Sequence, residues 1–391
     1  MRLVKTRQTI RIAAFALAVL CIVPAMDLAA QTLDTYPEYC SQGDSSTGAK
    51  YLICVPPPGQ WNGDLVVYAH GYVSPYDPLA VQDNVIDGTP ISQIITSLGY
   101  AFATTSYPKN GLVIPDAVED VAELVGCFKT TKGAPRNVFL VGASEGGLVT
   151  ARAIEKYPDV FNGGLAACGP VGDFRKQLNY FGDFLVLFNY FFPGVLEVGG
   201  KYATPRGIPE EIIRRWGTAY EAAVREAIEG SLSKTRQLLR TAGVPAAPTD
   251  SETVQTVVDI LWYNIFGTND AIGKLGGSPY SNIGRWYSGS SNDILLNLLV
   301  KRYSADRGAV DKIQTGGYQT SGVLQRPLVT MHTTDDPIVP YWHEPLYTWK
   351  ALLGGSALRH VNIPVVRFGH CSFTEAEVLA GFALLTFMAG A

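Results

Sequence analysis

Residues 138–150, VFLVGASEGGLVT, place a single serine between glycines where two sequence patterns meet. The apolar run before Gly142 predicts a buried strand, and the residues from Gly147 onward predict a helix. At such a turn the serine backbone is strained, and side chains at Gly142 and Gly146 would clash, so glycine is needed at both positions. The stretch therefore predicts that Ser144 is a nucleophile, with the start of a helix beside it that favours negative charge.

The segments around this serine alternate between strand and helix patterns. We expect strands at 64–70, 100–106, 137–141 and 163–168, and helices at 91–98, 116–128 and 147–157. The expected strands are almost continuously apolar, which is typical of a mostly parallel sheet with helices on both faces. The pattern therefore indicates a protein of the α/β class.

The pattern changes to long helices after residue 172 and returns to alternation after residue 326. Helical spacing extends over 209–242, and Thr249 with Glu252 is expected to cap a helix over 254–266. Later strands are expected at 326–331 and 360–367, and later helices at 345–353 and 374–388. The simplest organisation is an α/β core, 31–171 and 326–391, interrupted by a helical cap or lid, 172–325.

Residues 1–30 resemble a secretion signal, with a basic start, an apolar run and small residues at the end. Its removal takes away four positive charges and one negative charge, so the net charge changes from −4 to −7. A mildly acidic chain without a basic run gives no reason to expect nucleic acid or an anionic membrane as a partner. No later segment is apolar enough to span a membrane. We expect a secreted or periplasmic protein with no stable membrane anchor.

Five of the six cysteines lie after this segment, and Cys21 lies within it. An exported chain permits disulfides, and Cys40 and Cys54 flank a polar segment that they are expected to close as a hairpin. The other three cysteines, Cys127, Cys168 and Cys371, allow at most one further bond and leave one thiol. No cysteine or histidine pair has metal-ligand spacing, so we expect no metal site.

A nucleophilic serine needs a base, an acid that orients the base, and donors for the oxyanion. His370, in the stretch RFGHCSF after the last expected strand, is the candidate base. Two aspartates in the stretch HTTDDPIVP compete as the acid, and Asp336 fits the arrangement D-x-x-V-P better than Asp335.

The stretch HGY after the first expected strand supplies the remaining component, a donor for the oxyanion. Gly71 permits a tight turn, and the backbone N–H groups of Tyr72 and Glu145 are the expected oxyanion donors, each typically worth ~3 kcal/mol in the transition state. We expect the carboxylate of Glu145 to pair with a nearby cation. The alternative is that it binds a substrate amine, as an exopeptidase requires.

Taken in order, HGY, GASEGG, TTDDPIVP and FGHCSF resemble the motifs of the α/β-hydrolase superfamily. The resemblance covers residues ~60–170 and ~326–391. It implies the α/β-hydrolase fold, with the helical cap inserted between the sixth and seventh strands. It also implies a triad of Ser144, His370 and Asp336 that needs no cofactor.

The pair His370–Cys371 also resembles tannases and feruloyl esterases, in which the cysteine after the histidine bonds a cysteine before the serine. Ala143 precedes Ser144 here, so that bond cannot form. This second resemblance therefore implies that Cys168, at the end of the next strand, replaces it as the partner of Cys371.

Eight aromatic residues lie between residues 174 and 192. They are either an apolar wall over the serine, suited to aromatic or acyl groups, or the packing face of a cap helix. The candidate substrate contacts are Phe174, Phe181, Phe184 and His332. The remaining histidines, His343 and His360, are expected on the surface or in packing.

These features predict an exported serine hydrolase that cleaves small or polymeric carboxylic esters with apolar or aromatic groups through an acyl-enzyme. A serine exopeptidase or aminopeptidase of the same fold is the alternative. A hydrolase fold used only for binding is a third hypothesis, which the complete triad disfavours.

Overall fold

A computed structural model describes residues 36–391, so the secretion signal expected at 1–30, with Cys21, lies outside the described residues. An eight-stranded sheet forms the centre of the core. Its strands are β1 (Cys40–Asp44), β2 (Lys50–Cys54), β3 (Leu65–Ala69), β6 (Ala101–Thr105), β7 (Val138–Ala143), β8 (Gly163–Ala167), β11 (Leu328–Asp335) and β12 (His360–Phe368).

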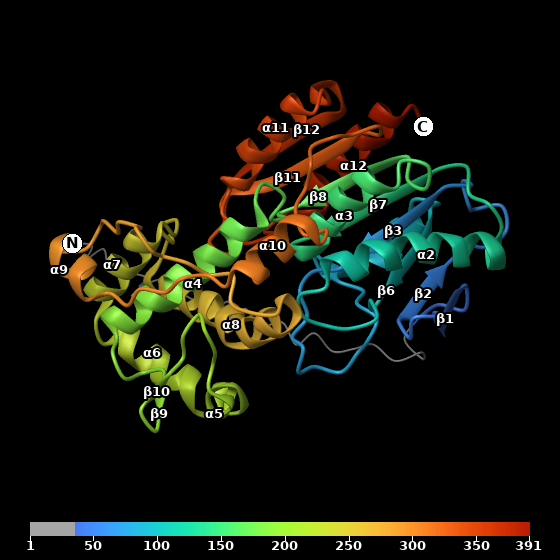
Figure 1. Cartoon of the computed structure of the whole chain (residues 1–391). Coiled ribbons are helices and arrows are strands. Elements are labelled where there is room, and N and C mark those ends of the chain that lie inside the picture. Colours follow the sequence, from blue (N-terminus) through green and yellow to red (C-terminus); the bar gives the residue numbers. More distant parts are fainter. Residues whose placement is uncertain (1–35) are drawn as a thin grey trace, which may run out of the picture. The chain divides into compact units, whose positions relative to one another are not determined.

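The strands lie in the order β1-β2-β6-β3-β7-β8-β11-β12 (Figure 1). Every neighbouring pair from β6 to β12 is parallel, whereas β1 pairs with β2, and β2 with β6, in antiparallel fashion. The predicted mostly parallel sheet is therefore confirmed. Cys40 lies opposite Cys54 in the β1–β2 hairpin, and the expected disulfide joins them.

Helices cover both faces of the sheet, because the central strands are apolar on both sides. On β3, Val67 belongs to an apolar cluster with residues of α2 (Ile114–Lys132) and α3 (Glu145–Lys156). Its neighbour Val66 belongs to the cluster on the opposite face, with residues of α12 (Glu375–Ala389). Successive residues of a strand point to opposite faces, so each strand contributes to both clusters. The other core helices are α1 (Ile91–Ser97), α11 (His343–Leu353) and a short 3-10 turn (Ala357–Arg359).

Helices dominate the chain between β8 and β11. They are α4 (Phe174–Phe191), α5 (Glu210–Arg214), a π-helical turn (Trp216–Tyr220), α6 (Glu221–Glu229), α7 (Leu232–Ala242), α8 (Asp250–Leu275), α9 (Asp293–Leu299) and α10 (Arg307–Thr315). Four two-residue strands make two small sheets: β4 (Val85–Ile86) with β5 (Thr89–Pro90), and β9 (Glu197–Val198) with β10 (Lys201–Tyr202).

The helical segment has an apolar cluster of its own, formed mainly by α4, α6, α7 and α8. The continuous helical pattern predicted over 209–242 is divided into four pieces. One break falls at Gly230 and Ser231, since glycine and serine both favour helix ends over helix interiors.

Helix α8 connects the helical segment to the core. It begins as expected, because the side chain of Thr249 accepts a hydrogen bond from the backbone N–H of Glu252. It continues past the expected end at residue 266, through Gly267 and Gly273, because Ala271 and Leu275 pack into the cluster on the α2 and α3 face of the sheet. Packing therefore outweighs the low helix propensity of glycine here. Across residues 36–391, no helix is both long enough and apolar enough to cross a membrane.

Candidate active site

Ser144 lies at the turn from β7 into α3, with φ 57° and ψ −123°. This is a backbone conformation that residues other than glycine rarely adopt. The two flanking glycines are required sterically: a Cβ at Gly142 would overlap the carbonyl oxygen of Gly146, and one at Gly146 would overlap that of Ala69. The local sequence thus forces the serine side chain outward from the end of the sheet.

The structure brings Ser144, His370 and Asp336 together. The Nε2 atom of His370 is 2.9 Å from Ser144 Oγ, and its Nδ1 atom is 2.7 Å from Asp336 Oδ2. A carboxylate only accepts, so Nδ1 carries the proton and Nε2 is free to accept from the serine hydroxyl. The competing Asp335 is exposed at the end of β11, and its Oδ2 accepts a hydrogen bond from Thr334.

Asp336 is fully buried and remains ionised. Burial alone would raise the pKa of its carboxyl group, but the neighbouring imidazoles of His370 and His332 outweigh that effect and lower the pKa to about 2. Its Oδ1 atom also accepts hydrogen bonds from the backbone N–H groups of Ile338 and Val339, at 2.8 and 3.0 Å. These bonds favour the charged form and fix the rotamer of the acid.

The cap helix α4 holds the loop that carries Asp336. The hydroxyl of Tyr180 donates to the carbonyl oxygen of Pro337 at 2.6 Å, and the amide of Gln177 donates to that of Ile338 at 2.8 Å. Nothing in the sequence indicated these contacts, because the partners are more than 150 positions apart. The helical segment therefore supports the loop that carries Asp336.

The turn after β3 faces Ser144, as expected. A Cβ placed on Gly71 would lie 3.2 Å from Ser144 Cβ, so the two turns are in contact. Among residues 36–391, the backbone N–H groups of Tyr72 and Glu145 donate to no protein acceptor, which leaves both available to an oxyanion. Tyr107 packs against this turn. Its hydroxyl donates to the carbonyl oxygen of His70 at 3.0 Å, and its ring stacks on the His70 imidazole with the centroids 4.0 Å apart.

The side chain of Glu145 differs from the expectation. It is buried, and its Oε1 atom accepts from the backbone N–H of Val113 at 3.1 Å, while no lysine or arginine in the described part of the chain lies within ion-pair distance. The predicted pairing with a cation is therefore wrong. Burial raises the pKa of Glu145 to about 8, so the side chain is a neutral acid at neutral pH.

A mostly apolar cavity opens onto Ser144, with about 890 Å³ of empty space including the part open to solvent. Phe174 and Phe181 line it, as expected, and the Phe181 ring stacks on Tyr263 of α8 at 5.4 Å. Phe184 and His332 do not line it. Phe184 is fully buried in the apolar cluster of the cap, and His332 is fully buried beneath the loop of Asp336, so both are corrected from substrate contacts to interior residues.

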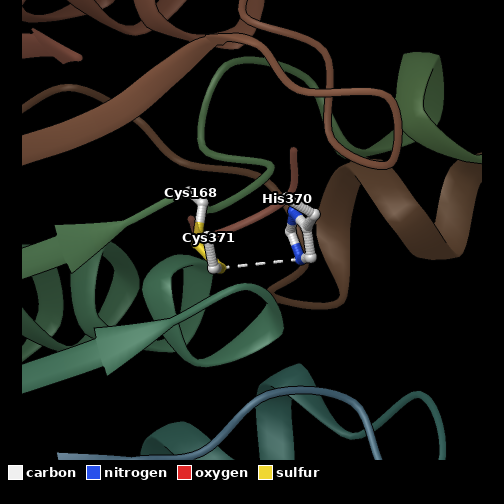
Figure 2. Close-up of side chains that lie close together, drawn as sticks. All are labelled: Cys168, His370 and Cys371. Carbon is white, nitrogen blue, oxygen red and sulfur yellow. Dashed lines mark hydrogen bonds between the residues drawn. A yellow bond between two sulfur atoms is a disulfide. The ribbon is translucent and has the colours of Figure 1, made fainter. Parts of the chain in front are cut away.

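A second disulfide lies beside His370. Cys168, which follows β8, is bonded to Cys371, and Figure 2 shows this bond next to the ring of His370, with Cys371 Sγ 3.6 Å from Nε2. The pairing implied by the sequence is thus present, and Cys127 is left as a free thiol. The three side chains in Figure 2 are close enough to hold a metal ion, but the sulfur atoms are joined to each other and do not provide thiolate ligands.

The serine turn follows the fifth strand of the chain's central sheet, the acid follows the seventh and the histidine follows the eighth. The fold is that of the α/β-hydrolases. No family model matches the sequence, and no curated protein matches it. Similarity to solved structures is found at low identity, and it concerns the fold alone.

Three of these structures illustrate the similarity. Feruloyl esterase B from Aspergillus oryzae is 14% identical, with a TM-score of 0.44 over 85% of this chain and 73% of that one. An esterase from Pyrococcus furiosus is 10% identical, with a TM-score of 0.44 over 90% of each chain. An acylaminoacyl peptidase from Pyrococcus horikoshii is 9% identical, with a TM-score of 0.41 over 85% of this chain, which spans 37% of the peptidase.

Proposed function

We propose that this α/β-hydrolase-fold protein is a serine hydrolase that cleaves carboxylic esters with apolar or aromatic groups. One observation carries the proposal, the arrangement around Ser144. Its Oγ atom lies 2.9 Å from His370 Nε2, and Asp336 Oδ2 lies 2.7 Å from Nδ1 of the same ring. The serine also faces a mostly apolar cavity. These distances are those at which an imidazole removes the proton of a hydroxyl as it attacks a carbonyl.

In the first half of the proposed reaction, Ser144 Oγ bonds to the ester carbonyl carbon, and its proton moves to His370 Nε2. The negative charge that forms on the carbonyl oxygen is stabilised by the backbone N–H groups of Tyr72 and Glu145 at the start of α3. Asp336 stabilises the imidazolium through the Nδ1–H bond. The bond to the alcohol then breaks, and the alcohol leaves with the proton from Nε2.

In the second half, water takes the place of the alcohol. His370 Nε2 removes a proton from the water as its oxygen attacks the acyl carbon. The same N–H groups stabilise the second tetrahedral intermediate. Its collapse breaks the bond to Ser144 Oγ, which recovers a proton from the imidazolium, and releases the carboxylic acid.

The carboxylates near the cavity favour an ester over a peptide with a free amino terminus. Glu145 is neutral at neutral pH, since burial raises its pKa to about 8. Asp183, an acidic residue of α4, accepts hydrogen bonds from three side chains of the cap, Tyr280, Tyr287 and Arg285. Neither offers a free negative charge to an ammonium group.

Hydrolysis of p-nitrophenyl esters from acetate to palmitate, by the wild type and by Ser144→Ala, tests the proposal. We expect turnover that depends on Ser144, with an optimum at an intermediate acyl length that the cavity accommodates. Folded wild type that hydrolyses none of these esters, or a Ser144→Ala variant that hydrolyses them as fast, would contradict the proposal.

We also propose that the protein acts after export, with its amino-terminal signal removed. The two disulfides support an oxidising compartment. Amino-terminal sequencing of the protein recovered outside the cytoplasm is expected to begin at Gln31, and an intact Met1 in that fraction would contradict the proposal.

A further inference from the structure

A buried group of charged residues lies behind the triad acid. His332 of β11 is fully buried between two carboxyl groups, those of Asp336 and of Glu344 on α11. Its Nε2 atom is 2.7 Å from the carbonyl oxygen of Val339 and 3.4 Å from Asp336 Oδ2, and its Nδ1 atom is 3.0 Å from Glu344 Oε1. His332 therefore contacts the loop that carries Asp336, here called the acid loop, on one side and the carboxyl group of Glu344 on the other.

The hydrogen bonds show where the protons of His332 lie. A carbonyl oxygen only accepts, so Nε2 must carry a proton and donate it to Val339. The other proton is shared along the Nδ1–Glu344 contact. Glu344 Oε2 already accepts hydrogen bonds from the hydroxyl of Thr330 at 2.5 Å and the amide of Asn362 at 2.6 Å.

With two donors on Oε2, the carboxyl group of Glu344 acts as a hydrogen-bond acceptor, and the nearby charge of Asp336 stabilises a positive charge on the ring. The shared proton is therefore held by the imidazole.

The other groups around His332 do not compete for this proton. The ring of Tyr341 meets the imidazole edge-on, with the centroids 5.9 Å apart. His360 on β12 makes a hydrogen bond with Thr330 at 3.0 Å, and burial lowers its pKa. His343, next to Glu344, is bonded to Gln177 and to backbone N–H groups, and burial holds its pKa well below the usual value. Tyr180 and Tyr263 are also near Asp336, and burial raises the pKa of both phenols, so they stay neutral, while His370 contacts Asp336 directly.

We propose that His332 is an imidazolium at neutral pH, held by Glu344, that positions the loop carrying Asp336 and keeps Asp336 ionised during the reaction. The proposal rests on the proposed function, because it assigns a role in the same triad. The pKa of His332 agrees with the geometry: burial alone would lower it, but the hydrogen bonds to Asp336 and Glu344 outweigh burial and raise it to about 10. His332 and Glu344 are thus positioning residues that do not touch the substrate.

The charge can be measured without any substrate. In ¹⁵N spectra of wild-type protein with labelled histidines, both ring nitrogens of His332 are expected to carry protons from pH 6 to pH 8.5. In Glu344→Gln, the same ring is expected to lose one proton at a lower pH than in the wild type. A neutral His332 ring in the wild type at pH 7 would overturn the proposal, whatever the activity of the protein.

The consequence for catalysis is measured from the pH profile of kcat/KM for a p-nitrophenyl ester. Loss of the imidazolium removes a positive charge from beside Asp336 and leaves the site more negative, so in His332→Gln the acidic limb of the profile is expected to move to higher pH by about one unit, with KM unchanged. His343→Gln is the matched control, since it removes a buried histidine that is already neutral, and its acidic limb is expected to stay in place.

An acidic limb of His332→Gln that coincides with those of the wild type and of His343→Gln would reduce His332 to a packing residue and overturn the proposal. Absence of turnover in the wild type is a different failure. It would contradict the proposed ester hydrolase, while the spectra of His332 would still decide whether the ring is charged.

Discussion

Two adjacent aspartates, Asp335 and Asp336, provide a comparison at the scale of a single residue. Asp336→Asn keeps the shape of the side chain but removes the acceptor charge that orients His370 and stabilises its protonated form. We expect kcat/KM for p-nitrophenyl esters to fall by roughly a thousandfold or more. Asp335→Asn changes an exposed neighbour and is expected to stay within about twofold of the wild type. A large loss in Asp335→Asn with activity retained in Asp336→Asn would reverse the assignment.

Glu145 gives a prediction about stability and pH. Its pKa is raised from 4.5 in the unfolded chain to about 8 by burial, so between these values the folded protein holds a proton that the unfolded chain has released. The free energy of unfolding is therefore expected to decrease as the pH rises from about 5 to 8.

In the neutral variant Glu145→Gln, the free energy of unfolding should no longer show this decrease between pH 5 and 8. Urea unfolding at several pH values measures the free energy of unfolding. His332 adds a decrease of the same sign between pH 6.5 and about 10 in both proteins, so the comparison isolates Glu145. An equal slope in the two proteins would show that Glu145 is ionised when folded.

The proximity of Ser144, His370 and Asp336 could be predicted from the sequence because its constraints are local. Glycines two positions before and after Ser144 mark a strained turn, and motifs at strand ends mark His370 and Asp336. The environment of Glu145 was predicted wrongly, because its burial depends on the loop at Val113, which the sequence does not connect to it. The role of His332 depends in the same way on contacts with another element.

Among the structural elements, the loop after β12 is tied to the end of β8 by the disulfide between Cys168 and Cys371. Removing this bond frees the loop that carries His370. We expect the Cys168→Ala, Cys371→Ala double variant to lose about tenfold or more in kcat/KM, since small displacements of a catalytic group are costly.

The matched control is Cys40→Ala with Cys54→Ala, which removes the hairpin disulfide between β1 and β2. This variant is expected to have a lower Tm and an unchanged kcat/KM. Equal losses of activity in the two double variants would mean that the bond at β8 acts on stability alone.

The cap helix α4 contacts the acid loop through Tyr180, which does not line the cavity. Tyr180→Phe leaves the buried carbonyl oxygen of Pro337 without its donor, which typically costs about 1–3 kcal/mol of stability. We expect kcat to fall by a similar factor for short and long esters, with KM little changed, because the variant changes the position of Asp336 and not the contacts with the substrate. A change in KM that depends on acyl length would contradict this account.

For the molecule as a whole, the sequence predicted the core better than the cap. The strands of the core are apolar and their ends carry recognisable motifs, so their order and class could be inferred. The cap follows a helical period, but the placement of its helices is set by contacts between distant segments, such as Phe181 with Tyr263. For the same reason Phe184, on the same helix as Phe181, was assigned to the cavity although it belongs to the core of the cap.

The cap also connects the two halves of the site. Tyr72, whose backbone N–H is an expected oxyanion donor, donates its hydroxyl hydrogen bond to the carbonyl oxygen of Phe266 in α8 at 3.2 Å, while α4 holds the loop that carries Asp336. The helical segment thus supports both the turn at Tyr72 and the loop that carries Asp336, which follows from the three-dimensional structure and from no local pattern.

The most direct test of the central claim, that Ser144 is a nucleophile activated by His370 and Asp336, is mass spectrometry of the folded protein after reaction with a fluorophosphonate. We predict one adduct per chain, rapid labelling of wild type, and its location on the peptide that contains Ser144. Ser144→Ala should remain unlabelled, and Asp336→Asn should be labelled far more slowly. A folded wild type that stays unlabelled, or that is labelled on another residue, would contradict the account.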